Sequence, residues 1–181
     1  MSDSERPAPH LPDSALTFVL GGARSGKSRH AEALATALPA PWLYLATGQA
    51  FDAEMAARIA HHRARRGPGW ETREAPLDLA GALAAAPAGQ AVLVDCLTLW
   101  LSNLMLAGRD PEAEGDRLLA VLARPRGPWI LVSNEVGMGI VPENALARAF
   151  RDAAGRLNQR VAAQAGTVIL AVAGLPLRVK G

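Results

Sequence analysis

The sequence has few aromatic residues, a single cysteine and almost no net charge. Aromatic side chains make up 4% of the 181 residues whereas hydrophobic residues make up 50%, so we expect a core of alanine, leucine and valine. The one cysteine, Cys96, excludes a disulfide within the chain and is compatible with a reducing cytoplasm. The formal net charge is +2, and the arginines are scattered apart from one cluster at 63–66, so charge gives no indication of nucleic-acid binding.

The sequence also lacks a long hydrophobic run. Its longest apolar stretch, 91–101, is interrupted by Asp95 and is too short to span a bilayer. Residues 1–14 are rich in proline and contain no apolar segment of the kind that a signal peptide needs. We therefore expect a soluble, cytoplasmic protein that makes no use of a membrane, with a flexible tail at 1–14 and a single nucleotide-binding catalytic domain at 15–181.

The most informative stretch is G-x-x-x-x-G-K-S, which lies between an apolar run at 16–20 and a helical pattern at 29–38. A strand, a glycine-rich turn and a helix in this order are typical of a P-loop. The N–H groups of the turn and the positive end of the helix would hold phosphate oxygens, while Lys27 reaches the β- and γ-phosphates and the Ser28 hydroxyl ligates Mg²⁺. An ordinary glycine-rich turn is the alternative, but the number of matching positions favours binding of a nucleoside triphosphate. The predicted phosphate-binding residues are Gly21, Gly22, Ala23, Arg24, Ser25, Gly26, Lys27 and Ser28.

Apolar runs alternate with helical patterns along the rest of the chain. Strand patterns lie at 16–20, 42–46, 91–94, 129–133 and 167–173, with shorter candidates at 70–74 and 177–180. Helical patterns cover 29–38, 51–66, 77–86, 98–107, 117–123 and 143–165, while 109–116 is polar and is interpreted as a loop. The predicted inner stripe of the last helix consists of Leu146, Phe150, Ala153, Leu157 and Val161. This alternation predicts an α/β fold of three layers, a P-loop NTPase (RecA-like) domain with a largely parallel central sheet.

The carboxyl ends of parallel strands meet at one edge of a sheet, where α/β proteins bind their ligands. Gly21, Thr47, Asp95 and the pair Asn134 and Glu135 all fall at this edge. Asp95 follows four apolar strand residues, as a Walker B acid does, and would support Mg²⁺ together with the P-loop serine; alternatively, it caps the next helix. Glu135 could act as a base or hold Mg²⁺ or substrate, or its loop could simply turn the chain, and the pattern leaves both open.

The helical pattern at 51–66 carries two histidines. His62 shares a face with Met55, Ile59 and Arg66, whereas His61 points roughly 100° away from it. A histidine on an apolar face is most often a core residue, and the arginines that follow could be a solvated surface. They could also complement phosphate charge, and a neutral imidazole is a competent nucleophile toward phosphorus. A metal site is disfavoured, because adjacent helix residues diverge and the sequence offers no third histidine or cysteine nearby.

Four stretches resemble a known family. They are GGARSGKSRHAEALA (21–35), YLATGQAFDAEMAARIAHHRARR (44–66), VDCLTLWLSNLM (94–105) and SNEVGMGIVPENALARAFRDAAGRLNQRVA (133–162). With the ending VAGLPLRVK they cover most of the chain from Leu16 onward. P-loops are common, but the D-x-E-M…H-H segment and the NEVGMGIVP loop are specific. On these motifs the sequence resembles the bifunctional adenosylcobinamide kinase/adenosylcobinamide-phosphate guanylyltransferases of cobalamin biosynthesis.

The resemblance implies a reaction sequence and a set of site residues. Family members phosphorylate adenosylcobinamide with ATP or GTP, and then transfer GMP from GTP to adenosylcobinamide phosphate through a guanylylated histidine, giving adenosylcobinamide-GDP and pyrophosphate. The family histidine matches His62, which would be catalytic together with Lys27. Members assemble as homotrimers. Besides the P-loop, family nucleotide contacts match Ala46, Thr47, Gly48, Arg63, Ala64, Arg65, Arg66, Glu74 and Asp95, and the expected Mg²⁺ ligands are Ser28 and Asp95.

The match is weaker in places, and two rival hypotheses stay open. The acid at position 95 could equally be glutamate in the family, and the segments 80–90 and 108–126 match poorly and could influence corrinoid contacts. One rival is a small-molecule P-loop kinase without a covalent intermediate, in which His62 is a core residue. The other is a nucleotide-dependent switch or assembly protein with slow hydrolysis.

Overall fold

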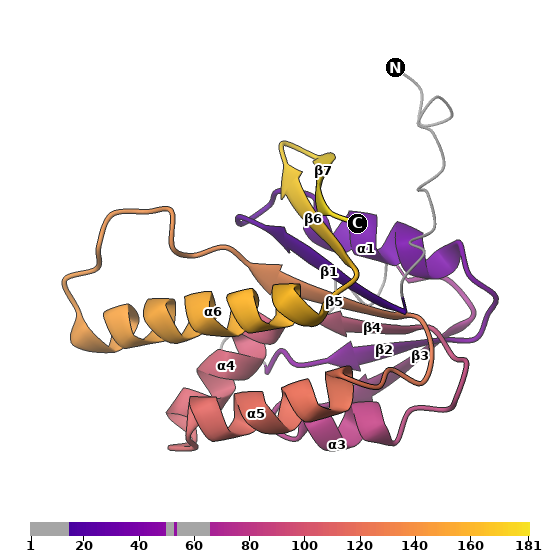
Figure 1. Cartoon of the computed structure of the whole chain (residues 1–181), viewed down its shortest axis with the longest axis horizontal. Coiled ribbons are helices and arrows are strands. Elements are labelled where there is room, and N and C mark those ends of the chain that lie inside the picture. Colours follow the sequence, from indigo (N-terminus) through magenta and orange to yellow (C-terminus); the bar gives the residue numbers. More distant parts are fainter. Residues whose placement is uncertain (1–14, 50–52, 54–65) are drawn as a thin grey trace.

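The computed structural model describes residues 15–49, 53 and 66–181, and within them the chain forms one seven-stranded sheet with helices on both faces (Figure 1). The strands are β1 (Leu16–Gly21), β2 (Trp42–Ala46), β3 (Trp70–Glu74), β4 (Val92–Asp95), β5 (Trp129–Asn134), β6 (Thr167–Val172) and β7 (Leu175–Lys180). The helices are α1 (Lys27–Thr36), α3 (Leu79–Ala84), α4 (Leu97–Leu106), α5 (Pro111–Leu122) and α6 (Ala145–Gln164). The predicted tail at 1–14 and nearly all of the predicted helix at 51–66 lie outside the described residues.

The strands lie in the order β3-β2-β4-β5-β1-β6-β7. All neighbouring pairs from β3 to β6 are parallel, and β7 pairs with β6 in the antiparallel sense. The predicted α/β fold with a largely parallel sheet is therefore confirmed. The position of β5 is important for the site, because it places one strand between the P-loop strand β1 and the strand β4 that ends in Asp95.

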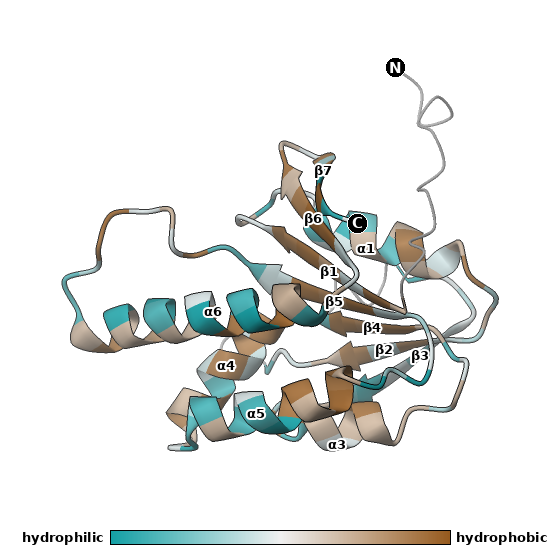
Figure 2. Cartoon of the chain, viewed as in Figure 1, coloured by the Kyte–Doolittle hydropathy of each residue, from teal (hydrophilic) through white to brown (hydrophobic). Residues whose placement is uncertain are grey.

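The central strands are buried on both faces because helices cover both. On one face, Phe18, Leu45 and Leu131 belong to a hydrophobic cluster with residues of α3, α4, α5 and α6. On the other, Val19 and Ile130 pack with α1. Figure 2 shows hydrophobic residues along the central strands and hydrophilic ones along much of α5 and α6. None of the helices in the described ranges is long and apolar enough to cross a membrane.

The interpretation of 109–116 as a loop is wrong, because α5 begins at Pro111. The Asp110 side chain accepts a hydrogen bond from the backbone N–H of Glu112. Pro111 lacks a backbone N–H, but this costs nothing because the first N–H groups of a helix have no partner within the helix. The half-buried Arg109 and the exposed Arg117 both donate to Glu114, which is nearly buried. The polar composition is thus that of a helical first turn that is capped by Asp110 and stabilised by ion pairs. The sequence Asp110-Pro111-Glu112 was the signal from which this helix start could have been predicted.

The inner stripe of α6 is confirmed only in its second half. Ala153, Leu157 and Val161 are buried, whereas Phe150 is half-buried and Leu146 is 59% exposed. Figure 1 shows why: the first turns of α6 and the loop before them extend beyond the end of the sheet, so this part of the helix has no strand beneath it. The helix begins at Ala145 rather than at residue 143, because the Asn144 side chain accepts hydrogen bonds from two backbone N–H groups of its first turn.

Candidate active site

The glycine-rich turn after β1 has the close backbone packing of a phosphate-binding loop. A Cβ at Gly21 would lie 2.7 Å from the carbonyl oxygen of Ala171, so no larger residue fits there. Gly26 has φ +93° and a Cβ on it would lie 3.0 Å from Cα of Gly174, in the turn between β6 and β7. The same turn donates the N–H of Gly174 to the carbonyl of Ser25, 2.9 Å away. Two glycines and the β6–β7 turn therefore fix the shape of the loop.

Lys27 folds back over this loop. It is the first residue of α1, is 9% exposed, and its Nζ donates to the carbonyl oxygen of Gly22 at 3.1 Å. An ammonium group held across the mouth of the turn lies where the N–H groups and the helix dipole also favour negative charge. Ser28 follows on the half-buried first turn of α1, so the structure brings the predicted phosphate-binding residues together.

The ends of the neighbouring strands continue this edge in register. Gly21 pairs with Asn134 of β5, Asp95 with Val132 of β5 and with Ala46 of β2, and Ala46 with Glu74 of β3. Glu74 is exposed and Asp95 is half-buried. The order from Gly21 to Glu74 spans five strands, so the predicted contacts at Ala46, Glu74 and Asp95 lie on one edge with the P-loop. This confirms that they share a location, and their roles stay predictions.

Thr47 has a structural task at this edge. Its hydroxyl donates to the carbonyl of Cys96 at 2.7 Å and accepts from the N–H of Cys96 at 2.8 Å, and its own carbonyl accepts from Asn103 Nδ2 at 2.7 Å. The side chain is fully buried. Thr47 therefore fastens the end of β2 to the end of β4, and its hydroxyl is committed to that contact. Burial raises the pKa of the Cys96 thiol to about 11, and the charge of Asp95 adds to the effect, so this cysteine is a neutral packing residue.

Asp95 is held by Tyr44, a residue that the sequence analysis did not single out. The Tyr44 hydroxyl donates to Asp95 Oδ2 at 3.2 Å, and the guanidinium carbon of Arg66 lies 3.7 Å from the centre of the Tyr44 ring. Burial, reinforced by the Asp95 charge, raises the pKa of the phenol above its ordinary value, so the hydroxyl stays protonated and remains a donor. The signal in the sequence was a lone tyrosine within an apolar strand. Asp95 does not cap α4, whose N-cap residue is Cys96, so that alternative is excluded.

The chemistry of Ser28 and Asp95 fits a magnesium site completed by phosphate oxygens and water. The phenol of Tyr44 engages one carboxylate oxygen of Asp95, and Oδ1 makes no hydrogen bond to the described residues, so one oxygen is available to an ion or its water ligands. The described part of the chain contains no cluster of three His, Cys, Asp or Glu residues that could hold a metal by itself. A cation at this edge would therefore depend on the nucleotide for part of its coordination.

Glu135 is turned toward its own loop. Its Oε1 accepts the N–H of Gly137 at 2.6 Å, and its backbone N–H donates to the carbonyl of Gly21 at 3.1 Å. These contacts favour the interpretation in which the loop turns the chain. The catalytic candidate His62 and its neighbours Arg63, Ala64 and Arg65 lie outside the described residues, whereas Arg66 is described and half-buried.

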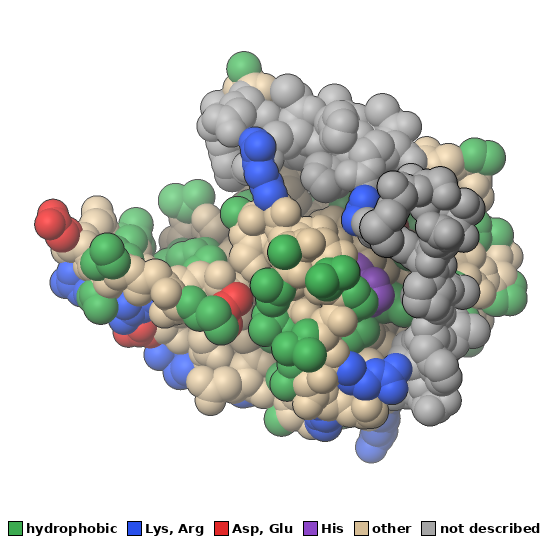
Figure 3. Space-filling view, turned by 90° about the horizontal axis from the view of Figure 1, so that it is seen from above, with side chains coloured by type: hydrophobic (Ala, Val, Ile, Leu, Met, Phe, Trp, Pro, Cys, Tyr) green, Lys and Arg blue, Asp and Glu red, His purple; other side chains and the backbone are tan. Residues whose placement is uncertain are grey.

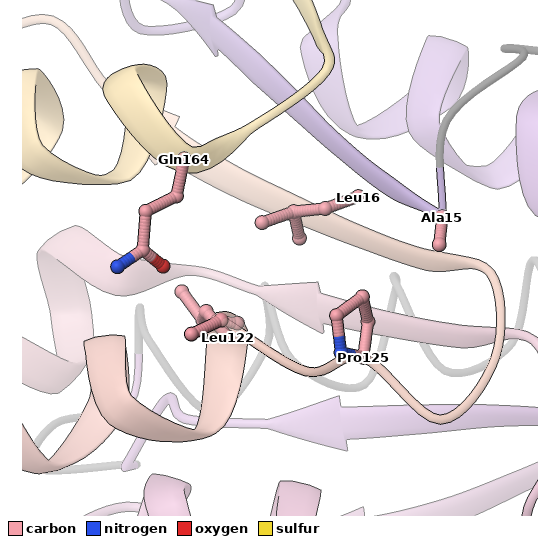
Figure 4. Close-up of a pocket in the computed structure, with 6 residues that line it drawn as sticks. Ala15, Leu16, Leu122, Pro125 and Gln164 are labelled. Carbon is pink, nitrogen blue, oxygen red and sulfur yellow. The ribbon is translucent and has the colours of Figure 1, made fainter.

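A separate hollow lies at the opposite end of the sheet (Figure 4). It has a volume of about 350 Å³ and is lined by Ala15, Leu16, Leu122, Ala123, Pro125 and Gln164. These residues belong to the start of β1 and the ends of α5 and α6, so the hollow is far from the carboxyl ends of the strands. It has no part in the site described above.

Comparison with known proteins identifies the family of the chain. Residues 17–179 match the family described as cobinamide kinase / cobinamide phosphate guanyltransferase. The chain is 51% identical to the bifunctional adenosylcobalamin biosynthesis protein CobP of Pseudomonas aeruginosa, over 91% of this chain and 96% of that protein. It is 47% identical to the bifunctional adenosylcobalamin biosynthesis protein CobU of Salmonella typhimurium, over 91% of this chain and 99% of that protein.

Solved structures with similar folds are distant in sequence. The flagellar accessory protein FlaH of Methanocaldococcus jannaschii matches with a TM-score of 0.55 and 13% identity, over 94% of this chain and 80% of that one. The RadB recombinase matches with a TM-score of 0.52 and 18% identity, over 88% of this chain and 74% of that one. These likenesses show the P-loop NTPase fold alone. The match over 17–179 and the identities to curated relatives go further, and this chain belongs to the cobinamide kinase / cobinamide phosphate guanyltransferase family.

Proposed function

We propose that this chain is a bifunctional enzyme of cobalamin biosynthesis that phosphorylates adenosylcobinamide and then transfers GMP from GTP to the product. The observation that carries the proposal is the sheet edge that holds both the loop before Lys27 and the strand end at Asp95, in a chain whose family is defined by these two activities. ATP or GTP serves as the phosphate donor, and GTP as the GMP donor. The composition and the secondary structure described above suit a cytoplasmic enzyme that acts on small molecules and binds neither nucleic acid nor membrane.

In the kinase step, the loop at 21–28 holds the triphosphate and Lys27 stabilises charge on the β- and γ-phosphates. The hydroxyl of the aminopropanol arm of adenosylcobinamide attacks the γ-phosphorus. Mg²⁺, when bound between Ser28 and Asp95, would neutralise phosphate charge. Tyr44 holds the Asp95 side chain in place, and Arg66 packs on the Tyr44 ring.

In the guanylyl step, His62 is the nucleophile. A bond forms between an imidazole nitrogen and the α-phosphorus as the bond to pyrophosphate breaks, and a phosphate oxygen of cobinamide phosphate then displaces the histidine. Arg63, Arg65 and Arg66 complement the phosphate charge. Support comes from Arg66, whose Nη1 is buried without a hydrogen-bond partner among the described residues, as expected of a group that waits for an anion.

Product analysis tests the proposal directly. The purified protein is incubated with adenosylcobinamide, Mg²⁺ and ATP, and then with GTP, and the corrinoids are separated by chromatography. Adenosylcobinamide phosphate is expected in the first stage, and adenosylcobinamide-GDP with released pyrophosphate in the second. Phosphorylation without GMP transfer would show that the protein is a simple kinase. Slow nucleotide hydrolysis without any corrinoid product would show that it is a nucleotide-dependent switch.

Tyr44→Phe is expected to weaken the apparent affinity for Mg²⁺ without unfolding the protein. Phenylalanine keeps the ring beneath Arg66 but removes the 3.2 Å hydrogen bond to Asp95. Loss of a group that orients a metal ligand typically lowers metal affinity by about tenfold. A Mg²⁺ titration of the phosphorylation rate should therefore shift to higher concentration. An unshifted titration in a variant of unchanged melting temperature would mean that the phenol only packs.

We further propose that the chain assembles as a homotrimer and that the segment between β5 and α6 takes part. Figure 1 shows this segment projecting beyond the sheet. It carries Met138, Ile140, Val141 and Leu146, which are 82%, 97%, 59% and 59% exposed. A second apolar surface lies on the β6–β7 hairpin, where Figure 3 shows hydrophobic side chains gathered. Exposed apolar groups of this kind mark contact surfaces.

Ile140→Asp is expected to dissociate the trimer into monomers, because it would bury a charge in an apolar contact. Sedimentation or light scattering measures the mass, and circular dichroism checks the fold. Leu106→Asp is the matched control, since Leu106 is 66% exposed but belongs to the last turn of α4 rather than to this segment. If the Ile140→Asp variant stays trimeric and becomes monomeric only when Leu177→Asp is added, the contact lies on the hairpin instead.

A further inference from the structure

Asn134 occupies the one strand end that separates the P-loop from Asp95. It is the last residue of β5 and pairs with Gly21 of β1, while Asp95 of β4 pairs with Val132 two residues earlier. Side chains alternate along a strand, so the Asn134 side chain lies on the face of Val132. That is the face covered by α1, the helix that begins with Lys27.

The preceding residue shows the alternation. The Ser133 hydroxyl lies 3.1 Å from the Thr98 hydroxyl of α4, on the opposite face of the sheet. Ser133 is buried there and takes no part in the edge. Asn134 is therefore the residue at the end of β5 whose side chain is on the P-loop side.

The backbone of Asn134 makes two hydrogen bonds, whereas its side-chain oxygen makes none within the described part of the chain. Its N–H donates to the Thr98 hydroxyl at 2.7 Å, and its carbonyl accepts from Asn158 Nδ2 at 3.3 Å. By contrast, Asn134 Oδ1 is buried and has no hydrogen-bond partner among the residues that the structure describes. A buried amide oxygen without a donor is unfavourable, so we expect this oxygen to accept a hydrogen bond from water or from a ligand group.

The position limits what that ligand group can be. Neighbouring strands lie about 4.8 Å apart, so the amide is one strand from Gly21 and one strand from Asp95. A triphosphate on the P-loop would place its terminal phosphate, and the hydroxyl that attacks it, in this interval. A phosphate oxygen carries no proton to give, whereas a hydroxyl does. A carboxamide is not a base at neutral pH, so it can align a hydroxyl but cannot deprotonate it.

We propose that Asn134 Oδ1 accepts a hydrogen bond from the acceptor hydroxyl and aligns it for attack in the kinase step. The hydroxyl oxygen then bonds to the γ-phosphorus, the bond between the γ-phosphorus and its bridging oxygen to the β-phosphate breaks, the nucleoside diphosphate leaves, and the hydroxyl proton passes to solvent. The inference rests on the proposed function, because the hydroxyl is that of adenosylcobinamide. It assigns no role to Asn134 in the guanylyl step, in which the attacking atoms bear no hydroxyl.

The variant Asn134→Ala tests whether Asn134 acts in the kinase step alone. We expect kcat for phosphorylation of adenosylcobinamide to fall about a hundredfold, since misplacement of a reacting group by an ångström costs that much. ATP affinity, measured by calorimetry without corrinoid, and labelling of the protein from α-³²P-GTP should not change. Asn134→Ser, whose oxygen is too short to reach, should behave alike and serves if the alanine variant is unstable. Ser133→Ala is the matched control, expected to keep full kcat because its hydroxyl is on the other face.

The other outcomes overturn the inference. An unchanged kcat would show that the amide has no contact with the acceptor, and an equal loss of phosphorylation and labelling would make Asn134 a nucleotide-binding residue. Loss of ATP affinity would lead to the same conclusion. Lys27→Ala is measured in parallel: if it still phosphorylates adenosylcobinamide, the proposed site itself fails, which is distinct from failure of the Asn134 assignment alone.

Discussion

Lys27→Ala is expected to abolish both phosphorylation and guanylyl transfer, with a loss in each of about 10²- to 10³-fold or more. The Lys27 ammonium is nearly buried and spans the turn to the carbonyl of Gly22, so it faces the space that the loop encloses. Both steps draw on the same charge, because the γ-phosphate moves in one and pyrophosphate leaves in the other. Both steady-state rates and the dissociation constant for GTP should be measured on one preparation.

The chain supplies its own control for this change. Its other lysine, Lys180, ends β7 and donates to the carbonyls of Ala162 and Ala163 at the end of α6, at 3.0 and 2.9 Å. Lys180→Ala removes the same side chain from a surface contact, so both activities should survive. Retention of either activity in Lys27→Ala would mean that one triphosphate is bound elsewhere than over the turn.

The main features of the fold could be predicted from the sequence because they depend on local patterns. Near-continuous apolar runs such as 129–133 are typical of strands buried on both faces, and the glycine-rich turn identifies the first strand and helix. The misinterpreted segment 109–116 is polar, but the Asp-Pro pair that starts α5 obeys a capping rule that outweighs hydrophobic periodicity. The exposure of Leu146 depends on where the sheet ends, which periodicity along one helix cannot show.

The polar contacts within the site could not be predicted, because they join residues far apart in the chain. Tyr44 and Asp95 are separated by 51 positions, and Asn103 reaches Thr47 across 56. Which side chains meet depends on the order of strands, and β5 lies between β1 and β4 although it comes after both in sequence. Sequence therefore located the strand ends that we assign to the site, whereas the tertiary structure was needed to show that Thr47 fastens two strands and that Asn134 Oδ1 lacks a partner among the described residues.

His62→Ala is expected to remove guanylyl transfer, by about 10⁴-fold or more, while phosphorylation of adenosylcobinamide continues. A missing nucleophile closes the covalent route, but the kinase step uses no histidine. The measurement is incubation with α-³²P-GTP and Mg²⁺, denaturing electrophoresis, and treatment of the band with acid or alkali. A phosphoramidate label is lost in acid and kept in alkali, and it should be absent from the variant.

Two matched variants make this result specific. His61→Ala removes the adjacent imidazole, predicted to point elsewhere on the same helix, and His30→Ala removes one from α1; both should label normally. Labelling that persists in His62→Ala would exclude the covalent route through this residue. Because Lys27→Ala should remove both activities and His62→Ala only one, the pair distinguishes a shared phosphate site with a separate nucleophile from two independent sites. A simple kinase would show no label even in the unmodified protein, and a switch would show neither label nor phosphorylated corrinoid.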